Sequence, residues 1–228
     1  MNSLGILVLL AAIAFGPGGR FRLEESRDGF GTRSHGVVET IAPGRTKAYP
    51  LPQSTAADFV RLRPEDARLN PVDAQRYERE EWIGPHQVEG GRLWFGNSYY
   101  DGEGERGVGA FGYFDTATRT YTIFRPPEMA RWEASAMLVE RERVWIGLDR
   151  FGEDISTFPG GLLEWNRTTH AVRKYDLEFV IGSIRREGDA LRLENRYGGY
   201  ALLRGGEVRR FLANGKATDK FPAPPSHY

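Results

Sequence analysis

Short apolar stretches alternate with polar turns along most of the chain, and the pattern recurs. Arg92–Gly96 reads Arg-Leu-Trp-Phe-Gly, and Arg143–Gly147 reads Arg-Val-Trp-Ile-Gly. These stretches lie roughly 50 residues apart, and the turns that follow, at Asp115 and Asn166, keep that spacing. Four short strands in each repeat of roughly 45–50 residues are typical of one blade of a β-propeller. We therefore interpret Trp94 and Trp145 as packing residues between blades.

The repeats predict an all-β fold, a small β-propeller of about four four-stranded blades with a partly helical insertion. The blades are expected at about residues 8–51, 82–127, 132–178 and 180–213, with the insertion at 52–80. Ala56–Val60 and Pro64–Leu69 are read as short helical turns inside that insertion. A degenerate fifth blade is the alternative for this segment. Residues 214–228 contain three prolines and are expected to form a flexible tail.

The N-terminal apolar run, Leu4–Phe15, has two interpretations, because it is too short to span a bilayer as a helix. Ala12-Ile13-Ala14 resembles a signal-peptidase site, so residues 1–14 could be a signal peptide of a periplasmic or secreted protein. Gly18–Arg22 also copies Gly90–Trp94, which follows a predicted strand. Residues 8–15 would then be the first inner strand of a cytoplasmic propeller. Both interpretations stay open.

Composition removes several classes of function. The 228 residues include no cysteine, which excludes disulfides, thiolate metal sites and cysteine nucleophiles. Lys plus Arg and Asp plus Glu both number 31, so the net charge is zero and no basic field is available for nucleic acid. We expect neither nucleic-acid binding nor a transmembrane span.

Several motifs resemble the repeats of streptogramin lyase-like propellers and related bacterial regulator propellers. They are Pro85-His86, Leu93-Trp94-Phe95, Gly112–Asp115 and Tyr49–Pro52. The resemblance implies a propeller architecture. In the lyases a His on an innermost strand acts as base, and a Glu three residues after the Trp supports a magnesium site. His86 matches the catalytic His, whereas the Glu position is occupied by Asn97.

Two long connections between the second and third strands of a blade, residues 97–109 and 149–161, are the predicted binding face. Their equivalent positions in the repeat should place them at one end of the molecule. Their carboxylates, guanidiniums and aromatic rings suit a polar small molecule, a sugar or a peptide. The candidate ligand-binding residues are Asn97, Tyr99, Tyr100, Asp101, Glu103, Arg106, Asp149, Arg150, Phe151, Glu153 and Asp154.

Two further candidates carry chemistry. Asp101, Glu103 and Glu105 alternate with glycines and could wrap a divalent cation, calcium or magnesium; a solvated acidic turn is the alternative. His86 could face the channel and act as a base near neutral pH. It could instead be a core imidazole that shares its strand face with Val88.

Three functions follow from these observations. The preferred hypothesis is a non-catalytic propeller that binds a ligand or partner at the face of loops 97–109 and 149–161. The first alternative is a lyase-like or hydrolase-like enzyme that uses His86 and a divalent cation. The second alternative is a scaffold for protein interaction, a homo-oligomer among them, in which a partner or second copy completes the open end of the ring.

Overall fold

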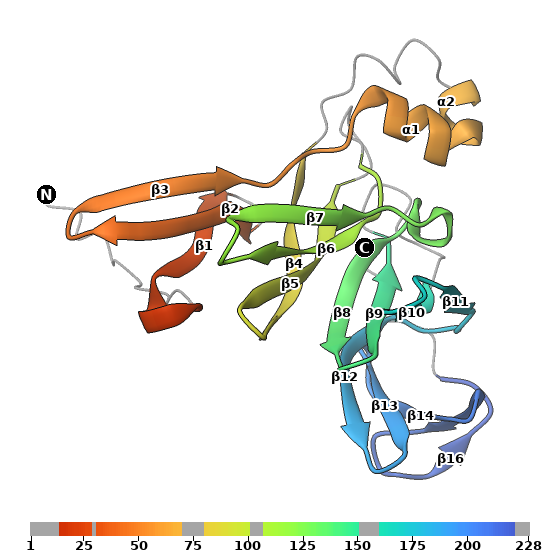
Figure 1. The fold of residues 1–228 in the computed structure, drawn as a ribbon. Helices are drawn as coiled ribbons and strands as arrows, with labels where there is room; N and C mark the ends of the chain where they lie inside the picture. The colour runs from red at the N-terminus through yellow and green to blue at the C-terminus, as the bar shows by residue number, and fades with distance from the viewer. Residues whose placement is uncertain (1–13, 29–30, 70–79, 101–106, 151–159, 222–228) are drawn as a thin grey trace, which may run out of the picture.

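The computed structural model describes residues 14–28, 31–69, 80–100, 107–150 and 160–221. Three antiparallel sheets follow one another along this part of the chain, and two short helices are inserted after the third strand (Figure 1). The predicted all-β class is confirmed. Each sheet is built mainly from neighbouring strands in sequence order, as the repeats require.

The first sheet joins two of the predicted blades, because Ser34 of β2 pairs with Ile83 of β4. Its two halves fold toward each other, so that β1 and β2 share a buried cluster with β5 and β6. Seven strands form it: β1 (Phe21–Asp28), β2 (Gly31–Ala42), β3 (Arg45–Pro50), β4 (Glu81–Glu89), β5 (Arg92–Tyr99), β6 (Phe111–Asp115) and β7 (Thr120–Phe124).

The second and third sheets are antiparallel meanders. The second contains β8 (Glu133–Val139), β9 (Arg143–Asp149), β10 (Gly161–Asn166) and β11 (Val172–Tyr175). The third contains β12 (Ile181–Glu187), β13 (Ala190–Asn195), β14 (Tyr200–Arg204), β15 (Glu207–Phe211) and β16 (Ala217–Thr218). This third sheet continues past residue 213, where the tail was expected to begin. Asn214 and Gly215 turn the chain back into β16, and Phe221 is only 7% exposed.

Polar turns set the strand boundaries where the repeat predicts them. An oxygen of the Asp115 side chain accepts hydrogen bonds from the backbone N–H groups of Ala117 and Thr118, at 2.9 and 3.2 Å. Asn166 does the same for Thr168 and Thr169 in the second sheet, at 2.9 and 2.8 Å. The side chain thus replaces a strand partner and stops the ladder.

The insertion carries the two expected helices, α1 (Ala56–Leu62) and α2 (Pro64–Leu69). Thr55 and Asp58 form a reciprocal capping box at the start of α1, which satisfies free N–H groups of the first turn. Phe59 packs against Val108 and Ala130, so the helices cover the base of a loop in the first sheet. Short 3₁₀ turns, η1 (Pro17–Gly19) and η2 (Pro127–Met129), complete the elements. No helix within the described ranges is long and apolar enough to cross a bilayer.

Buried clusters fill the seams between sheets. Trp94 of the first sheet packs with Val144, Ile146 and Trp165 of the second sheet. Trp145, on the opposite face of the second sheet, packs with Leu191 and other residues of the third. The interpretation of both tryptophans as packing residues is confirmed.

Ion pairs reinforce the same seams. Arg167 of the second sheet contacts Glu89 of the first at 2.9 Å, and Arg186 of the third contacts Glu140 of the second at 2.6 Å. The Gln87 side chain adds a neutral link, because it bonds both the N–H and the C=O of Val139 at 2.9 and 3.2 Å. Neighbouring sheets are therefore fixed by directional contacts as well as by apolar packing.

Phe15 marks the N-terminal limit of the described core. It forms a bridge with Phe21, its side chain is 4% exposed, and the two backbones exchange hydrogen bonds of 2.9 and 3.1 Å. The chain therefore enters β1 through the predicted glycine turn at Gly18 and Gly19. Residues 1–13, on which the signal-peptide and inner-strand interpretations depend, lie outside the described residues.

Candidate functional site

Two buried carboxyl groups meet where β8 begins and β9 ends. Glu133 and Asp149 are paired in the antiparallel register, and they are 9% and 7% exposed. The hydroxyl of Ser98 donates to the backbone oxygen of Ala134 at 3.3 Å, which brings the end of β5 to the same place. We refer to Glu133 and Asp149 together as the carboxyl pair.

Arg196, from the turn after β13, completes the cluster. Its guanidinium forms an ion pair with the Asp149 carboxylate and thereby connects the second and third sheets. Burial and the nearby Asp149 charge together raise the pKa of Glu133 to about 8, against the opposing effects of Arg196 and of hydrogen bonds from Ser98 and Tyr99. Burial also raises the pKa of Asp149, again opposed by Arg196.

Near neutral pH the three side chains of this cluster therefore have three different hydrogen-bonding roles. Glu133 keeps its proton and can donate or accept a hydrogen bond. Asp149 accepts, and Arg196 donates. Such a mixture of donors and acceptors is suited to hydroxyl or amide groups of a polar ligand.

Glu81 occupies the corresponding first position of β4, but its carboxylate is fully engaged within the protein. It accepts hydrogen bonds from the N–H and hydroxyl of Ser54 and, at 3.0 Å, from the N–H of Val108. Glu81 thus anchors the insertion to the first sheet. Glu133 is hydrogen-bonded by the Ser98 side chain and the Tyr99 backbone, at the end of β5, instead of by the insertion. The two repeats therefore use the same position to join different segments.

Asn97, at the position of the lyase Glu, is 2% exposed and connects β5 to the segment before β6. Its amide donates to the C=O of Val108 at 2.8 Å and accepts from the N–H of Ala110 at 2.7 Å. Its side-chain amide is therefore used to hold together the two ends of the predicted loop 97–109. Tyr99 is 1% exposed and lies opposite Glu81 in the register, whereas Tyr100 is partly exposed.

The other predicted ligand-binding residues divide between the described cluster and the undescribed loops. Asp149 belongs to the carboxyl pair, and the backbone N–H of Arg150 donates to its carboxylate at 2.8 Å. The remaining candidates lie outside the described residues: Asp101, Glu103, Arg106, Phe151, Glu153 and Asp154. The ends of β5 and β9, from which both loops leave, nevertheless lie together at the carboxyl pair.

His86 lies away from this cluster. It lies roughly 16 Å along β4 from Glu81, at about 3.3 Å per residue. Its ring is half-buried, with Nδ1 at 3.1 Å from the backbone oxygen of Gly84. Gln87 points toward β8, so His86 faces the opposite way, the side on which Val88 is 41% exposed. Within the described residues, His86 is therefore not part of the cluster at the carboxyl pair.

The predicted metal ligands, Asp101, Glu103 and Glu105, also lie outside the described residues. Elsewhere, within the part of the chain that the structure describes, no group of three or more acidic or histidine side chains has an arrangement that could hold a metal ion. The carboxyl pair supplies only two oxygen-bearing side chains next to a guanidinium, which is an unfavourable environment for a cation.

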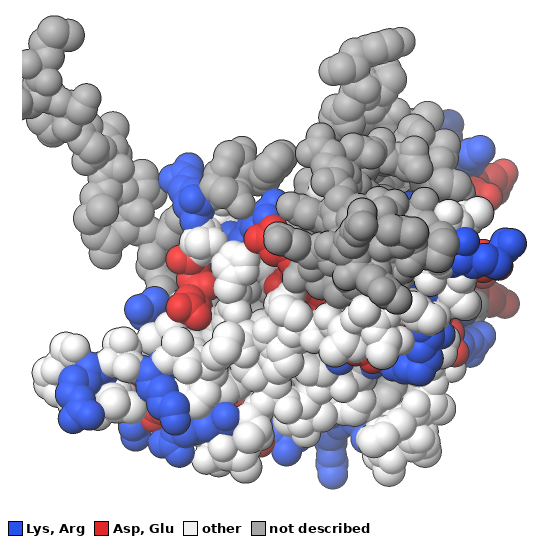
Figure 2. Space-filling model, turned by 90° about the horizontal axis from the view of Figure 1, so that it is seen from above, with Lys and Arg blue, Asp and Glu red and all other residues white. Residues whose placement is uncertain are grey.

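Charged side chains and two hollows mark other parts of the described surface. In Figure 2, Lys and Arg gather at the lower left of the visible face and are mixed with Asp and Glu at its right edge. A hollow of about 430 Å³ lies at β15 and β16, and one of about 320 Å³ lies at Glu140–Arg143 and Arg186. The first hollow belongs to the third sheet, and the second lies at the turn between β8 and β9, at the opposite end of these strands from the carboxyl pair.

Sequence reasoning missed Glu133 and Arg196. The available signal was the repeat itself, because Glu81 and Glu133 begin equivalent inner strands. Arg196 could not be found in this way. It lies in the short turn between β13 and β14, where the first two sheets have long loops at the equivalent position. Its role depends on the packing of the third sheet against the second.

No protein-family model matches the chain, and no curated protein matches it. Among solved structures, it is similar to a protein described as the extracellular domain of a one-component system from B. thetaiotaomicron, with a TM-score of 0.40 and 10% identity. The alignment covers 90% of this chain and 30% of that one. The computationally designed Ika8 protein matches with a TM-score of 0.34 and 10% identity, over 80% of this chain and 67% of the other.

Proposed function

We propose that the protein is a β-propeller that binds a polar ligand, without catalysis, at the carboxyl pair and the bases of loops 97–109 and 149–161. In this proposal the first sheet supplies two blades and the other sheets supply one each. The stacking of β4, β8 and β12 supports that arrangement, because β8 packs against β4 on one side and β12 on the other.

One observation carries the binding proposal. The buried Glu133 and Asp149 and the exposed Arg196 form a polar cluster at the point where the two long loops leave the sheets. Buried polar groups that converge at one end of a scaffold are a common basis of ligand recognition. The protonated Glu133 and the Asp149–Arg196 pair favour a neutral ligand rich in hydroxyl or amide groups, such as a sugar or a peptide backbone.

The test is a pair of arginine variants measured against the same probes. Arg196→Gln removes the partner of Asp149, and Arg186→Gln removes the partner of Glu140 between the same two sheets. Both variants should lose comparable thermal stability. The probes are panels of neutral mono- and disaccharides and of uncharged peptides, with binding measured by calorimetry on the full chain.

We expect a probe that binds the unchanged protein to lose about tenfold or more in affinity with Arg196→Gln, since a charged hydrogen-bonding group contributes about that much. Arg186→Gln should bind within about twofold of the unchanged protein. Equal losses in the two variants would assign the effect to sheet packing. Retention of full affinity by Arg196→Gln would place the ligand elsewhere.

A further inference from the structure

The outer edge of β15 is paired over only part of its length. On one side β15 pairs with β14 from Glu207 to Phe211. On the other side the described chain pairs only Arg210 with Thr218 and Phe211 with Ala217. Beyond Thr218 the chain turns away, with the Thr218 hydroxyl donating to the C=O of Lys220 at 2.7 Å.

One hydrogen bond shows the direction in which the free backbone groups of β15 point. The N–H of Leu212 donates to the C=O of Lys216 at 2.9 Å, so the backbone groups of Leu212 face β16. In an antiparallel ladder every second residue points its N–H and C=O to the same side. The backbone groups of Arg210 and Val208 therefore face this side too, and those of Val208 lie beyond the end of β16. They present an unpaired donor and acceptor on an open edge.

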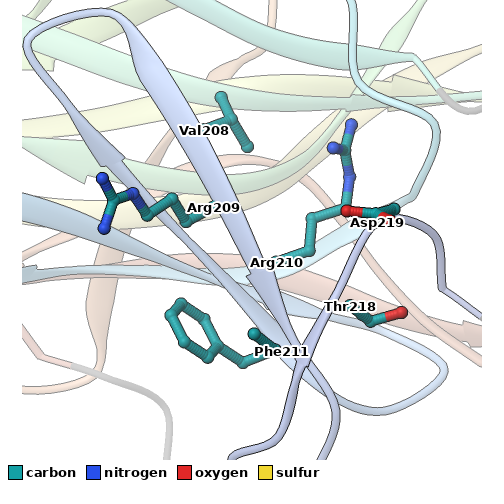
Figure 3. A pocket seen from close by; sticks show the side chains of 7 residues that line it. Val208, Arg209, Arg210, Phe211, Thr218 and Asp219 are labelled. Atoms are coloured by element: carbon teal, nitrogen blue, oxygen red, sulfur yellow. The ribbon is translucent and has the colours of Figure 1, made fainter.

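A hollow of about 430 Å³ lies at this position. Figure 3 shows Val208 and Arg210 on one side of β15 and Arg209 and Phe211 on the other, with Asp219 close to Arg210. An added strand would enter the hollow in line with β16 and contact side chains on both faces of β15. Its residues would then alternate between an apolar neighbour, Val208, and a cationic one, Arg209.

The charge around the edge is predominantly positive. Arg209 lies in the hollow, and the guanidinium of Arg173 lies against the adjacent turn, 3.3 Å from the position of a Cβ on Gly206. Glu207, on the same strand, and Asp219, in the hollow, are the acidic residues here, and Arg209, Arg210 and Arg173 outnumber them. This excess of basic side chains favours acidic residues at alternate positions of an added strand.

We propose that the open edge of β15 binds an extended peptide of alternating acidic and apolar residues, added as a strand in line with β16. Backbone hydrogen bonds to Val208 would supply affinity, and Arg209 and Arg173 would select acidic side chains. This interaction surface is separate from the carboxyl pair and does not depend on the function proposed above.

The probe is a fluorescein-labelled peptide of alternating glutamate and valine, about seven residues long, the length of a typical strand. Fluorescence anisotropy with the full chain measures binding, and a peptide of alternating lysine and valine is the comparison. Val208→Pro removes the N–H that faces the open edge without removing one that pairs with β14. Arg209→Glu reverses the charge in the hollow.

Val172→Pro is the matched control. Val172 lies on β11, the outermost strand of the second sheet, and both valines pack against the edge of a buried cluster. The N–H of Asn166 donates to the C=O of Ala171, so the N–H of Val172 points to the open side of β11. The two proline variants should therefore lower the stability of the fold by similar amounts. Val208 lines the hollow, whereas Val172 lies on the edge of a different sheet.

We expect the acidic peptide to bind the unchanged protein and the Val172→Pro variant equally, and Val208→Pro to weaken binding by about tenfold. Arg209→Glu should reverse the preference toward the lysine peptide. Equal binding by Val208→Pro and the unchanged protein would overturn the proposal, as would equal loss in the two proline variants. Sedimentation that shows a dimer abolished by Val208→Pro, without peptide binding, would assign the edge to a second copy and also overturn it.

Discussion

At the scale of single residues, burial gives equivalent glutamates different chemistry. Glu81 and Glu133 each begin an inner strand, and both are almost completely buried. Glu81 accepts hydrogen bonds from Ser54 and Val108. For Glu133, burial and the neighbouring Asp149 charge raise the pKa, so its protonated form is favoured. The chemistry of each carboxyl group is thus determined by what the neighbouring segment offers.

The Glu133 proton makes the stability of the protein depend on pH. The pKa of Glu133 is about 8 in the folded protein against an ordinary value of 4.5, so the folded state binds more protons between those pH values. The free energy of unfolding should therefore fall as pH rises from about 5 to 8. Glu133→Gln, which mimics the protonated carboxyl, should remove this dependence and be more stable above pH 8 by roughly 2–4 kcal/mol.

Urea unfolding from pH 5 to 9 measures this effect. Glu140→Gln is the control, because its pKa is lowered by Arg186 and its contribution does not decline over this range. Parallel pH profiles for the unchanged protein and Glu133→Gln would contradict the raised pKa. They would show that Glu133 is already ionised in the folded protein.

At the scale of elements, the polar turns are the best-specified parts of the sequence. Asp115 and Asn166 stand at equivalent positions and cap equivalent turns, and each turn ends on a residue with positive φ, Arg119 at 61° and His170 at 58°. Such backbone geometry is uncommon for residues other than glycine. Local hydrogen bonds and the repeat therefore specify the backbone of these turns, to which distant side-chain contacts of Arg119 with Glu39 and of His170 with Phe124 are added.

Asn166→Ala should lower the free energy of unfolding by about 1–2 kcal/mol, because it leaves the N–H groups of Thr168 and Thr169 without their acceptor. Asn166→Asp, which copies the residue at position 115, should retain most of the stability. Chemical denaturation of the two variants gives the comparison. A loss in Asn166→Asp as large as that in Asn166→Ala would contradict the assigned capping role.

Elements that depend on distant partners were the ones that sequence reasoning could not place. The turn at Asn214 and Gly215 resembles a tail when proline content is considered alone, yet Phe221 packs against Phe179 with ring centroids 4.9 Å apart. The pairing of Ser34 with Ile83, which joins two predicted blades, also spans an insertion whose length carries no register information. Strand existence could thus be predicted, whereas the association of strands into sheets could not.

At the scale of the whole molecule, the second sheet occupies the central position. It is covered on one face by the cluster around Trp94 and on the other by the cluster around Trp145. β3, in contrast, is exposed over most of its length. In stacked repeats, stability comes largely from contacts between neighbours, so a sheet with two neighbours should open less often than an exposed edge strand.

Hydrogen exchange measured by mass spectrometry should show this gradient. We expect the slowest amide exchange in β9 and β10 and the fastest in β3, under conditions in which the protein stays folded. Equal protection of β3 and β9 would contradict independent opening of the sheets. It would indicate that the entire array unfolds as one cooperative unit.

The contact between Gln87 and Val139 has a consequence for motion. The amide bonds both backbone groups of one residue, so translation of the second sheet along β4 would stretch both bonds at once. A small rotation about the same point would keep them. The contact lies far along β4 and β8 from the carboxyl pair. It would therefore act as a pivot, so that the angle between the two sheets should change more easily than their relative position along β4.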